Sequence, residues 1–221
     1  MEKGRKYLSF AGIFMLLFLI LTVAVKLVNV EQIGPLESSV GFAVLNGKVS
    51  EIFKFNAAWY NITDVLGKLS ILVAVFFAVI GVYQLVKRKS IARVDKDLLL
   101  LACVYIVSAI AYVFFEVCII NYRPVILEGD LLEASFPSSH TVLVICFVGT
   151  ALHQFAHRIK DVKLKNISVA ICSVIILLMI VGRLVSGVHW FTDILGGILL
   201  GCAIVFAYAG MYEKTVHDKR H

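Results

Sequence analysis

The 221-residue chain is poor in charge, in proline and in paired cysteines. Only 16% of its residues are charged and 60% are hydrophobic, whereas a soluble domain is about 25% charged. This balance excludes an ordinary soluble domain and a disordered chain, and three prolines beside 15 glycines exclude a collagen-like or linker-rich architecture. The five cysteines form no C-x-x-C pair, so neither a disulfide framework nor a zinc site is indicated.

Six long apolar runs dominate the sequence, and each approaches the length of about 20 residues that crosses a bilayer as a helix. They cover residues 7–25, 69–86, 98–115, 141–156, 167–182 and 194–212. We therefore predict an all-α, polytopic membrane protein with six transmembrane helices in a bundle. We expect a single integral-membrane domain over residues 1–221, with a motif-bearing core at residues 98–210.

Three features qualify this layout. The first run exceeds the apolar region of a signal peptide, about 7–15 residues, and shows no convincing small-x-small cleavage site, so we expect it to be retained. Residues 29–67 are partly apolar and are expected to lie along the membrane interface. In the last run, Gly197-x-x-x-Gly201 allows close helix contact, and we favour packing inside the bundle over a dimer interface.

The positive charge of the chain, formally +6, gathers at alternate ends of the runs. Lys and Arg cluster within residues 3–6, 87–96, 158–165 and 214–220. The opposite ends hold only Lys26, Lys48, Lys54, Lys68, Arg123 and Arg183. Because cytoplasmic loops carry the excess of Lys and Arg, both termini are predicted to be cytoplasmic. Bases at membrane edges also account for the net charge without a nucleic-acid partner.

Polar clusters fall at the predicted outer end, which is otherwise poor in bases. They lie at residues 121–124, 136–140, 182–183 and 189–193. A charge at mid-span costs about 2.5–3.5 kcal/mol, so charges within or beside spans need a reason. Taken singly, a histidine or arginine near a helix end is an ordinary interfacial anchor. Independent anchors would not all choose this end, and we infer that folding joins the clusters in one site.

The residue types at this end suit phosphoryl transfer. Arg123 and Arg183 offer planar forks of donors for phosphate. Residues 137–140 are typical of a helix start, where free backbone N–H groups bind anions. His189 and Asp193 are four residues apart, so on a helix they would share a face and the carboxylate would orient the imidazole.

The second histidine of this end, His140, comes from another predicted helix. One histidine could therefore attack phosphorus while the other donates a proton, which is a constellation for phosphoryl transfer without a metal ion.

Three motifs together, Arg123-Pro124, Pro137-Ser138-x-His140 and Arg183-x5-His189-x3-Asp193, resemble the three-part signature of the type 2 phosphatidic acid phosphatase family. That family shares its core with vanadium haloperoxidases. The motif region, residues 116–193, covers about a third of the chain, and the six-span layout extends the resemblance to nearly all of it.

The resemblance implies a role for each matched position. His189 would be the nucleophile that forms a phosphohistidine, Asp193 would orient it, and His140 would protonate the leaving group and then activate water. The phosphoryl oxygens would be held by Arg123, Arg183, Ser138 and the backbone near Ser139. The resemblance implies no metal ion and no cofactor.

One departure from the family pattern concerns charge. The family usually has a lysine seven residues before its first arginine, where this chain has Glu116. A carboxylate there would repel phosphate, or would pair with Arg123 or Arg183 and set its pose. Lys68 or Lys26, at outer span ends, could replace the missing lysine.

Two smaller departures accompany it. Ser139 stands where the family often has glycine, and Gly182 stands where serine is usual.

His153 and His157 are four residues apart, which could suggest a metal pair. Because they fall at the cytoplasmic end, far from the other clusters, we favour interfacial residues there.

The sequence thus predicts a metal-independent lipid phosphate phosphatase, a multi-pass protein of the cell membrane with its active site on the extracytoplasmic side. Its partner would be a lipid phosphate in the bilayer, with undecaprenyl diphosphate, phosphatidic acid and phosphatidylglycerol phosphate as candidates. Two alternatives stay open. One is a lipid phosphotransferase of the same chemistry, and the other is a non-catalytic lipid-binding or transport protein, which Glu116 favours.

Overall fold

The computed structural model describes residues 2–127 and 129–217, and six of its helices are long and apolar enough to cross a membrane. They are α1 (Glu2–Leu27), α3 (Ala57–Arg88), α4 (Lys96–Val117), α5 (Ser139–Arg158), α6 (Val162–Val185) and α7 (Phe191–Tyr212). The predicted all-α fold with six spans is confirmed. Five of these helices extend beyond the predicted apolar run by at most five residues at either end. Helix α3 begins about three turns before its run, so residues 57–67, expected to lie along the interface, belong to this helix. Lys219 and Arg220, counted among the C-terminal bases, lie outside the described residues.

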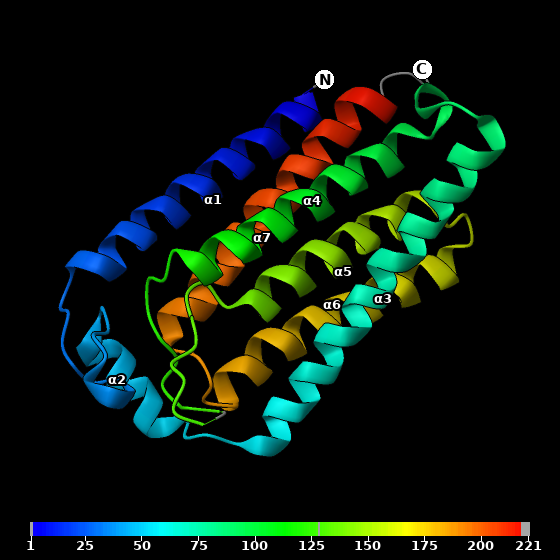
Figure 1. Cartoon of the computed structure of the whole chain (residues 1–221). Helices are drawn as coiled ribbons and strands as arrows, with labels where there is room; N and C mark the ends of the chain where they lie inside the picture. The colour runs from blue at the N-terminus through cyan, green and yellow to red at the C-terminus, as the bar shows by residue number, and fades with distance from the viewer. Residues whose placement is uncertain (1, 128, 218–221) are drawn as a thin grey trace.

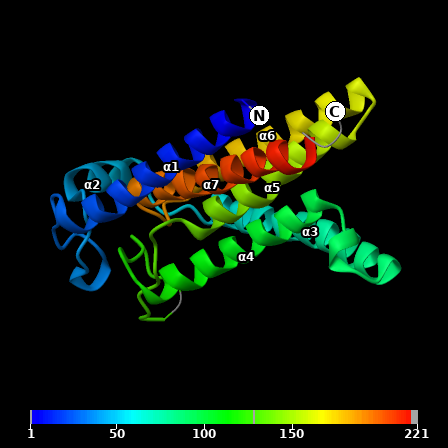
Figure 2. The same cartoon turned by 90° about the horizontal axis from the view of Figure 1, so that it is seen from above.

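Helices α5 and α7 form the centre of the bundle. Within the most apolar stretch of each span, 61% of the residues of α5 and 56% of those of α7 are buried, against 17–22% in the other spans. Helix α1 packs along α7, and α6 packs along α5. Helix α3 lies on the opposite side of this central pair from α1 (Figures 1 and 2). Helix α4 packs against both α5 and α7, and its Phe115 contacts Phe18 of α1. The outer helices expose many Leu, Ile, Val and Phe side chains, as a lipid-facing surface requires.

Two glycines of α7 let the central helices approach closely. A Cβ atom added at Gly197 would lie 2.8 Å from Thr141 Cβ, and one added at Gly201 would lie 2.8 Å from Ile145 Cβ. Both neighbours are on α5, so these glycines pack inside the bundle, as predicted from the sequence.

A short helix, α2 (Ala43–Ile52), lies in the segment that the sequence assigns to the membrane interface. It docks on the beginning of α7 through Asn46, whose side chain is fully buried. Asn46 Nδ2 donates to Thr192 Oγ1 at 3.0 Å, and Asn46 Oδ1 accepts from the Thr192 backbone N–H at 3.2 Å. This pairing holds the first turn of α7, which also carries Asp193. The remaining short helical turns are η1 (Pro35–Glu37), η2 (Ile91–Arg93) and η3 (Glu213–His217).

The two ends of the bundle differ in what they carry. The beginning of α1 and the end of α7 lie together at one end (Figure 1). Helix α2, the beginnings of α5 and α7, and the end of α6 lie at the other. The polar clusters at residues 136–140, 182–183 and 189–193 lie at the beginning of α5, the end of α6 and the beginning of α7. They therefore meet at the end of the bundle opposite the termini.

Candidate active site

His189 lies in the turn between α6 and α7, one residue before the Trp190 N-cap of α7. The expectation that His189 and Asp193 share a helical face is therefore wrong, because the helix begins only at Phe191. Asp193 sits in the first turn and its Oδ2 accepts the Trp190 backbone N–H at 2.9 Å. The distance from His189 Nδ1 to Asp193 Oδ2 is 3.8 Å, which is too long for a hydrogen bond.

Ser135 bridges this gap. Its Oγ lies 3.0 Å from His189 Nδ1 and donates to Asp193 Oδ2 at 2.5 Å. The Ser135 hydroxyl thus donates its hydrogen bond to the carboxylate, and its oxygen can accept a hydrogen bond from the imidazole N–H. The contact between nucleophile and carboxylate that the sequence predicts as direct is a relay through a serine in the loop before α5.

The hydrogen bond on the other ring nitrogen fixes the tautomer of His189. Arg183 Nη2 lies 2.9 Å from His189 Nε2. A guanidinium can only donate, so Nε2 accepts and the ring proton is on Nδ1, facing Ser135. The lone pair of Nε2 therefore points toward the guanidinium, on the side where an anion would bind.

Burial and the positive charge of Arg183 nearby hold the pKa of His189 well below its usual value, and Arg123 adds to the effect. The imidazole is therefore neutral at physiological pH, which is the form that can act as a nucleophile.

Arg183 itself is completely buried near the end of α6. Its Nη1 donates to Thr63 Oγ1 at 3.3 Å, and its guanidinium lies over the ring of Tyr60 at 5.6 Å. Its Nε has no hydrogen-bond partner among the described residues. A buried guanidinium with a free donor is arranged to receive an anion.

Gly182, beside Arg183, makes room for α3. A Cβ atom at position 182 would lie 2.6 Å from Thr63 Cγ2. A serine there would therefore collide with the residue whose hydroxyl contacts Arg183. In this chain a hydroxyl reaches the arginine from α3 rather than from the neighbouring residue.

His140, in the first turn of α5, contacts the first few turns of α3. Its Nε2 lies 3.5 Å from Asp64 Oδ1, and the same carboxylate pairs with Lys68 at 2.7 Å. Gly67 lies against the imidazole, since a Cβ atom there would be 2.6 Å from His140 Cδ2. His140 is also among the groups that lower the pKa of His189, so the two predicted histidines are close enough to interact.

Arg123, Ser138 and Ser139 differ in their partners and in how accessible they are. Arg123 Nη1 pairs with Glu133 Oε2 at 3.0 Å across the loop between α4 and α5. Ser138 is fully buried as the N-cap of α5, and its N–H donates to Asp193 O at 2.9 Å. Ser139 is half-buried and lines an open cleft. Ser138 is thus already engaged with the protein, whereas Ser139 is accessible.

The cleft, of about 540 Å³, opens between α3, α4 and α5. Its polar side carries Asp64, Lys68, Glu116, Arg123, Ser139 and His140, and its apolar side carries Ile71, Leu143 and Phe147 among others. Among the described residues, the carboxylate in ion-pair distance of Arg123 is that of Glu133, not that of Glu116. Of the two lysines considered as replacements, Lys68 lines the cleft, whereas Lys26 donates to the carbonyl of Ile119 at 3.0 Å.

Comparison with known proteins identifies the family of the chain. A family model described as the PAP2 superfamily matches residues 69–216, more than half of the chain. The chain belongs to the PAP2 superfamily. This confirms the resemblance drawn from the three motifs.

Named relatives within the PAP2 superfamily match over shorter stretches. Phosphatidylglycerophosphatase B of Bacillus subtilis (strain 168) is 30% identical over 95 residues, which is 42% of this chain and 45% of the relative. Lipid phosphate phosphatase delta of Arabidopsis thaliana is 28% identical over 89 residues, 39% of this chain and 21% of the relative. The matched stretches span less than half the length of either relative.

The fold of the whole chain is that of a solved PAP2 protein. The crystal structure of a transmembrane PAP2 type phosphatidylglycerolphosphate phosphatase from Bacillus subtilis superposes with a TM-score of 0.66 and 23% sequence identity. The match covers 93% of this chain and 96% of that one. With its six apolar spans, the chain is a multi-pass membrane protein.

Sequence reasoning missed several residues that touch the predicted ones. Ser135 directly precedes the predicted segment 136–140, and only its position next to that segment could have drawn attention to it. Thr63 and Asp64 come from the second turn of α3, before residue 69, where the match to the PAP2 model begins. No spacing rule connects them with the later motifs.

Proposed function

We propose that this PAP2 protein hydrolyses a lipid phosphate or diphosphate through a phosphohistidine intermediate on His189. One observation supports this most. The Nδ1–H of a buried, neutral imidazole is held through Ser135 by Asp193, while its Nε2 lone pair faces the guanidinium of Arg183. A structural histidine needs no such orientation, whereas a nucleophile does.

In the first step, the lone pair of His189 Nε2 attacks phosphorus. The N–P bond forms as the bond from phosphorus to the lipid oxygen breaks. His140, in its protonated form, gives its proton to the departing alkoxide, or to the departing phosphate when the substrate is a diphosphate. Asp193, acting through Ser135, stabilises the positive charge that develops on the His189 ring.

In the second step, the now neutral His140 takes a proton from water, and the water oxygen attacks phosphorus. The N–P bond breaks, inorganic phosphate leaves and His189 returns to its neutral state. Arg183, Arg123 and the first-turn backbone N–H groups of α5, near Ser139, bind the phosphoryl oxygens most tightly when charge develops on them. Neither of the two proposed steps uses a metal ion or a cofactor.

The substrate class follows from the cleft. Its polar side holds Lys68, Arg123 and His140, and its apolar side continues along α3, α4 and α5 at bilayer depth. A soluble ester would not need a site with an apolar wall, so we infer a substrate with an apolar tail. Undecaprenyl diphosphate, phosphatidic acid and phosphatidylglycerol phosphate all fit this description, and the matched relatives are named for activity on lipid phosphates.

The side of the membrane follows from charge. The end of the bundle that carries the site is poor in Lys and Arg, and the end that carries both termini is rich in them. We infer that the termini are cytoplasmic and that the site is on the extracytoplasmic side.

A second candidate function is binding or transport of a lipid phosphate without hydrolysis. The observation that favours it is Glu116, a carboxylate on the same cleft wall as Arg123 and His140. A third, transfer of the phosphoryl group to another lipid, differs only in the acceptor of the second step.

Phosphate release by the purified protein from a panel of lipid phosphates and diphosphates separates the three functions. If the protein is a hydrolase, the wild type should release one inorganic phosphate for each phosphate lost from the lipid. His189→Ala should release none, although its thermal stability should equal that of the wild type. Phosphate-labelled lipid products with an added acceptor would indicate transfer. Substrate binding without any product from the wild type would leave only the binding function.

A further inference from the structure

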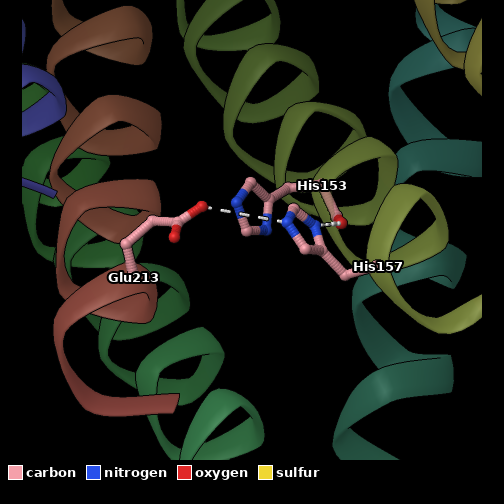
Figure 3. A group of neighbouring side chains, drawn as sticks. All are labelled: His153, His157 and Glu213. Carbon is pink, nitrogen blue, oxygen red and sulfur yellow. Dashed lines mark hydrogen bonds and ion pairs between the residues drawn. The ribbon is translucent and has the colours of Figure 1, made fainter. Parts of the chain in front are cut away.

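A second cluster of ligating side chains lies at the end of the bundle that carries the termini. It consists of His153 and His157 near the end of α5, and Glu213 directly after α7 (Figure 3). One ligand atom from each lies within 4.8 Å of the others. The two histidines are one helical turn apart, so they project from the same face of α5.

The orientation of His157 is fixed by its own helix. His157 Nδ1 lies 2.8 Å from the backbone carbonyl oxygen of His153, so this nitrogen carries the proton and donates. The lone pair of Nε2 is then directed at Glu213 Oε1, 3.9 Å away. Two acceptors facing each other repel unless a cation or a proton lies between them. A ring N–H bonded to a backbone carbonyl is also the usual support of a metal-binding histidine.

His153 adds an unsatisfied group. Both of its ring nitrogens are buried and lack a hydrogen-bond partner among the described residues. The ring stacks on His157 with centroids 4.2 Å apart and is enclosed by the rings of Tyr208 and Tyr212. Leaving a buried polar group without a partner costs about 1–3 kcal/mol, and a metal ion bound to one of the two nitrogens would remove that cost for the nitrogen it binds.

We propose that His153, His157 and Glu213 bind a divalent transition-metal ion of the Zn²⁺ class. Two imidazoles and one carboxylate are ligands that Zn²⁺ accepts, with a fourth position left for water. Neighbouring ligands of tetrahedral Zn²⁺ are about 3.3 Å apart, so the ligand atoms, now within 4.8 Å of one another, need to close by up to about 1.5 Å. The ion would join the end of α5 to the end of α7.

A lysine competes with a metal ion for the Glu213 carboxylate. Lys3 Nζ lies 3.0 Å from Glu213 Oε1, and its side chain is 61% exposed. Because it is exposed, it can turn into solvent when a metal ion takes its place. The lysine therefore weakens metal binding without preventing it.

The test uses tag-free, full-length protein in detergent, stripped with a chelator and titrated with Zn²⁺ against a chromophoric competitor. We expect one ion per chain and a rise in the thermal midpoint on binding. His157→Ala and Glu213→Gln should each weaken binding by about 100-fold or more, since even outer-shell changes cost about 10- to 100-fold. Lys3→Ala should tighten binding several-fold, whereas Lys6→Ala, the matched control on the same helix, should not change it.

Cobalt provides a second readout that does not depend on activity. Co²⁺ bound by wild-type protein should show the visible absorption of a four- or five-coordinate site, and His157→Ala should lose it. Absence of a stoichiometric ion, or equal binding by wild type and His157→Ala, would overturn the proposal and leave a proton-mediated His157–Glu213 pair. The cluster is remote from His189, so neither result depends on the proposed phosphatase function.

Discussion

Replacing Ser135 by alanine isolates the relay between His189 and Asp193. The substitution removes one oxygen from a buried position. It leaves the imidazole 3.8 Å from the carboxylate, which is beyond hydrogen-bond reach. The Nδ1–H then has no acceptor, and the hydrogen bond from Arg183 to Nε2 is left alone to oppose the tautomer in which Nε2 carries the proton and cannot attack.

The size of the effect follows from the hydrogen bonds that are lost. The Ser135 hydroxyl is bonded to a carboxylate and to the ring that becomes charged during the reaction. Hydrogen bonds to charged groups contribute about 1.5–3 kcal/mol. At about 1.36 kcal/mol per factor of ten, kcat should fall by about 10- to 150-fold, with little change in KM.

Steady-state phosphate release with a lipid phosphate in mixed micelles measures this change. Ser108→Ala is the matched control, because Ser108 is a buried serine that lines the same small pocket as Ser135 but lies outside the relay. Ser135→Thr, which keeps the hydroxyl, should retain most of the activity. Full activity of Ser135→Ala, at unchanged thermal stability, would refute the relay.

Three further predictions follow. Glu116→Lys should lower KM for a lipid phosphate several-fold in the same assay, because the cleft then loses a carboxylate that repels phosphate; a collapse of kcat would show instead that this carboxylate has its own role. Gly182→Ser should cost about 1–3 kcal/mol of stability through its collision with Thr63, and thermal unfolding should show that adding Thr63→Ala recovers part of the loss. Because the folded state holds the pKa of His189 well below its unfolded value of about 6.5, its contribution to stability is complete above that pH and is lost as pH falls below it. From pH 7 to pH 5 the wild type should therefore lose up to about 2 kcal/mol more unfolding free energy than His189→Gln, and equal losses would contradict the burial of a neutral imidazole.

The features that sequence could predict are those that leave a periodic or compositional mark. Six apolar runs predict six spans, and Lys and Arg at alternate ends predict which polar clusters share an end. From these two patterns follows the meeting of His140, Arg183 and His189. Gly197 and Gly201 likewise predict close packing inside the bundle, although the sequence does not say that the neighbouring helix is α5.

Other features depend on contacts between distant segments, which leave no such mark. Asp64 and Thr63 enter the site because α3 passes beside α5 and α6, and nothing in their local sequence distinguishes them from interfacial polar residues. The spacing of His189 and Asp193 suggests a shared helical face, but the helix begins at Phe191, two residues after His189. Ser135 takes over the contact instead.

The histidine pair at the other end shows the same limit. His153 and His157 look interfacial when only α5 is considered. The folded chain brings Glu213 to them from the end of α7, 56 residues after His157 in sequence. A third ligand at that separation is invisible to spacing rules.

The most direct test of the central claim is to find the phosphorylated residue. Protein mixed with lipid phosphate carrying a labelled phosphoryl group is quenched within one turnover and digested at alkaline pH, and the label is located by mass spectrometry. The account predicts phosphate on the ring of His189 in the wild type. Label on any other residue, or continued phosphate release by His189→Ala, would contradict it.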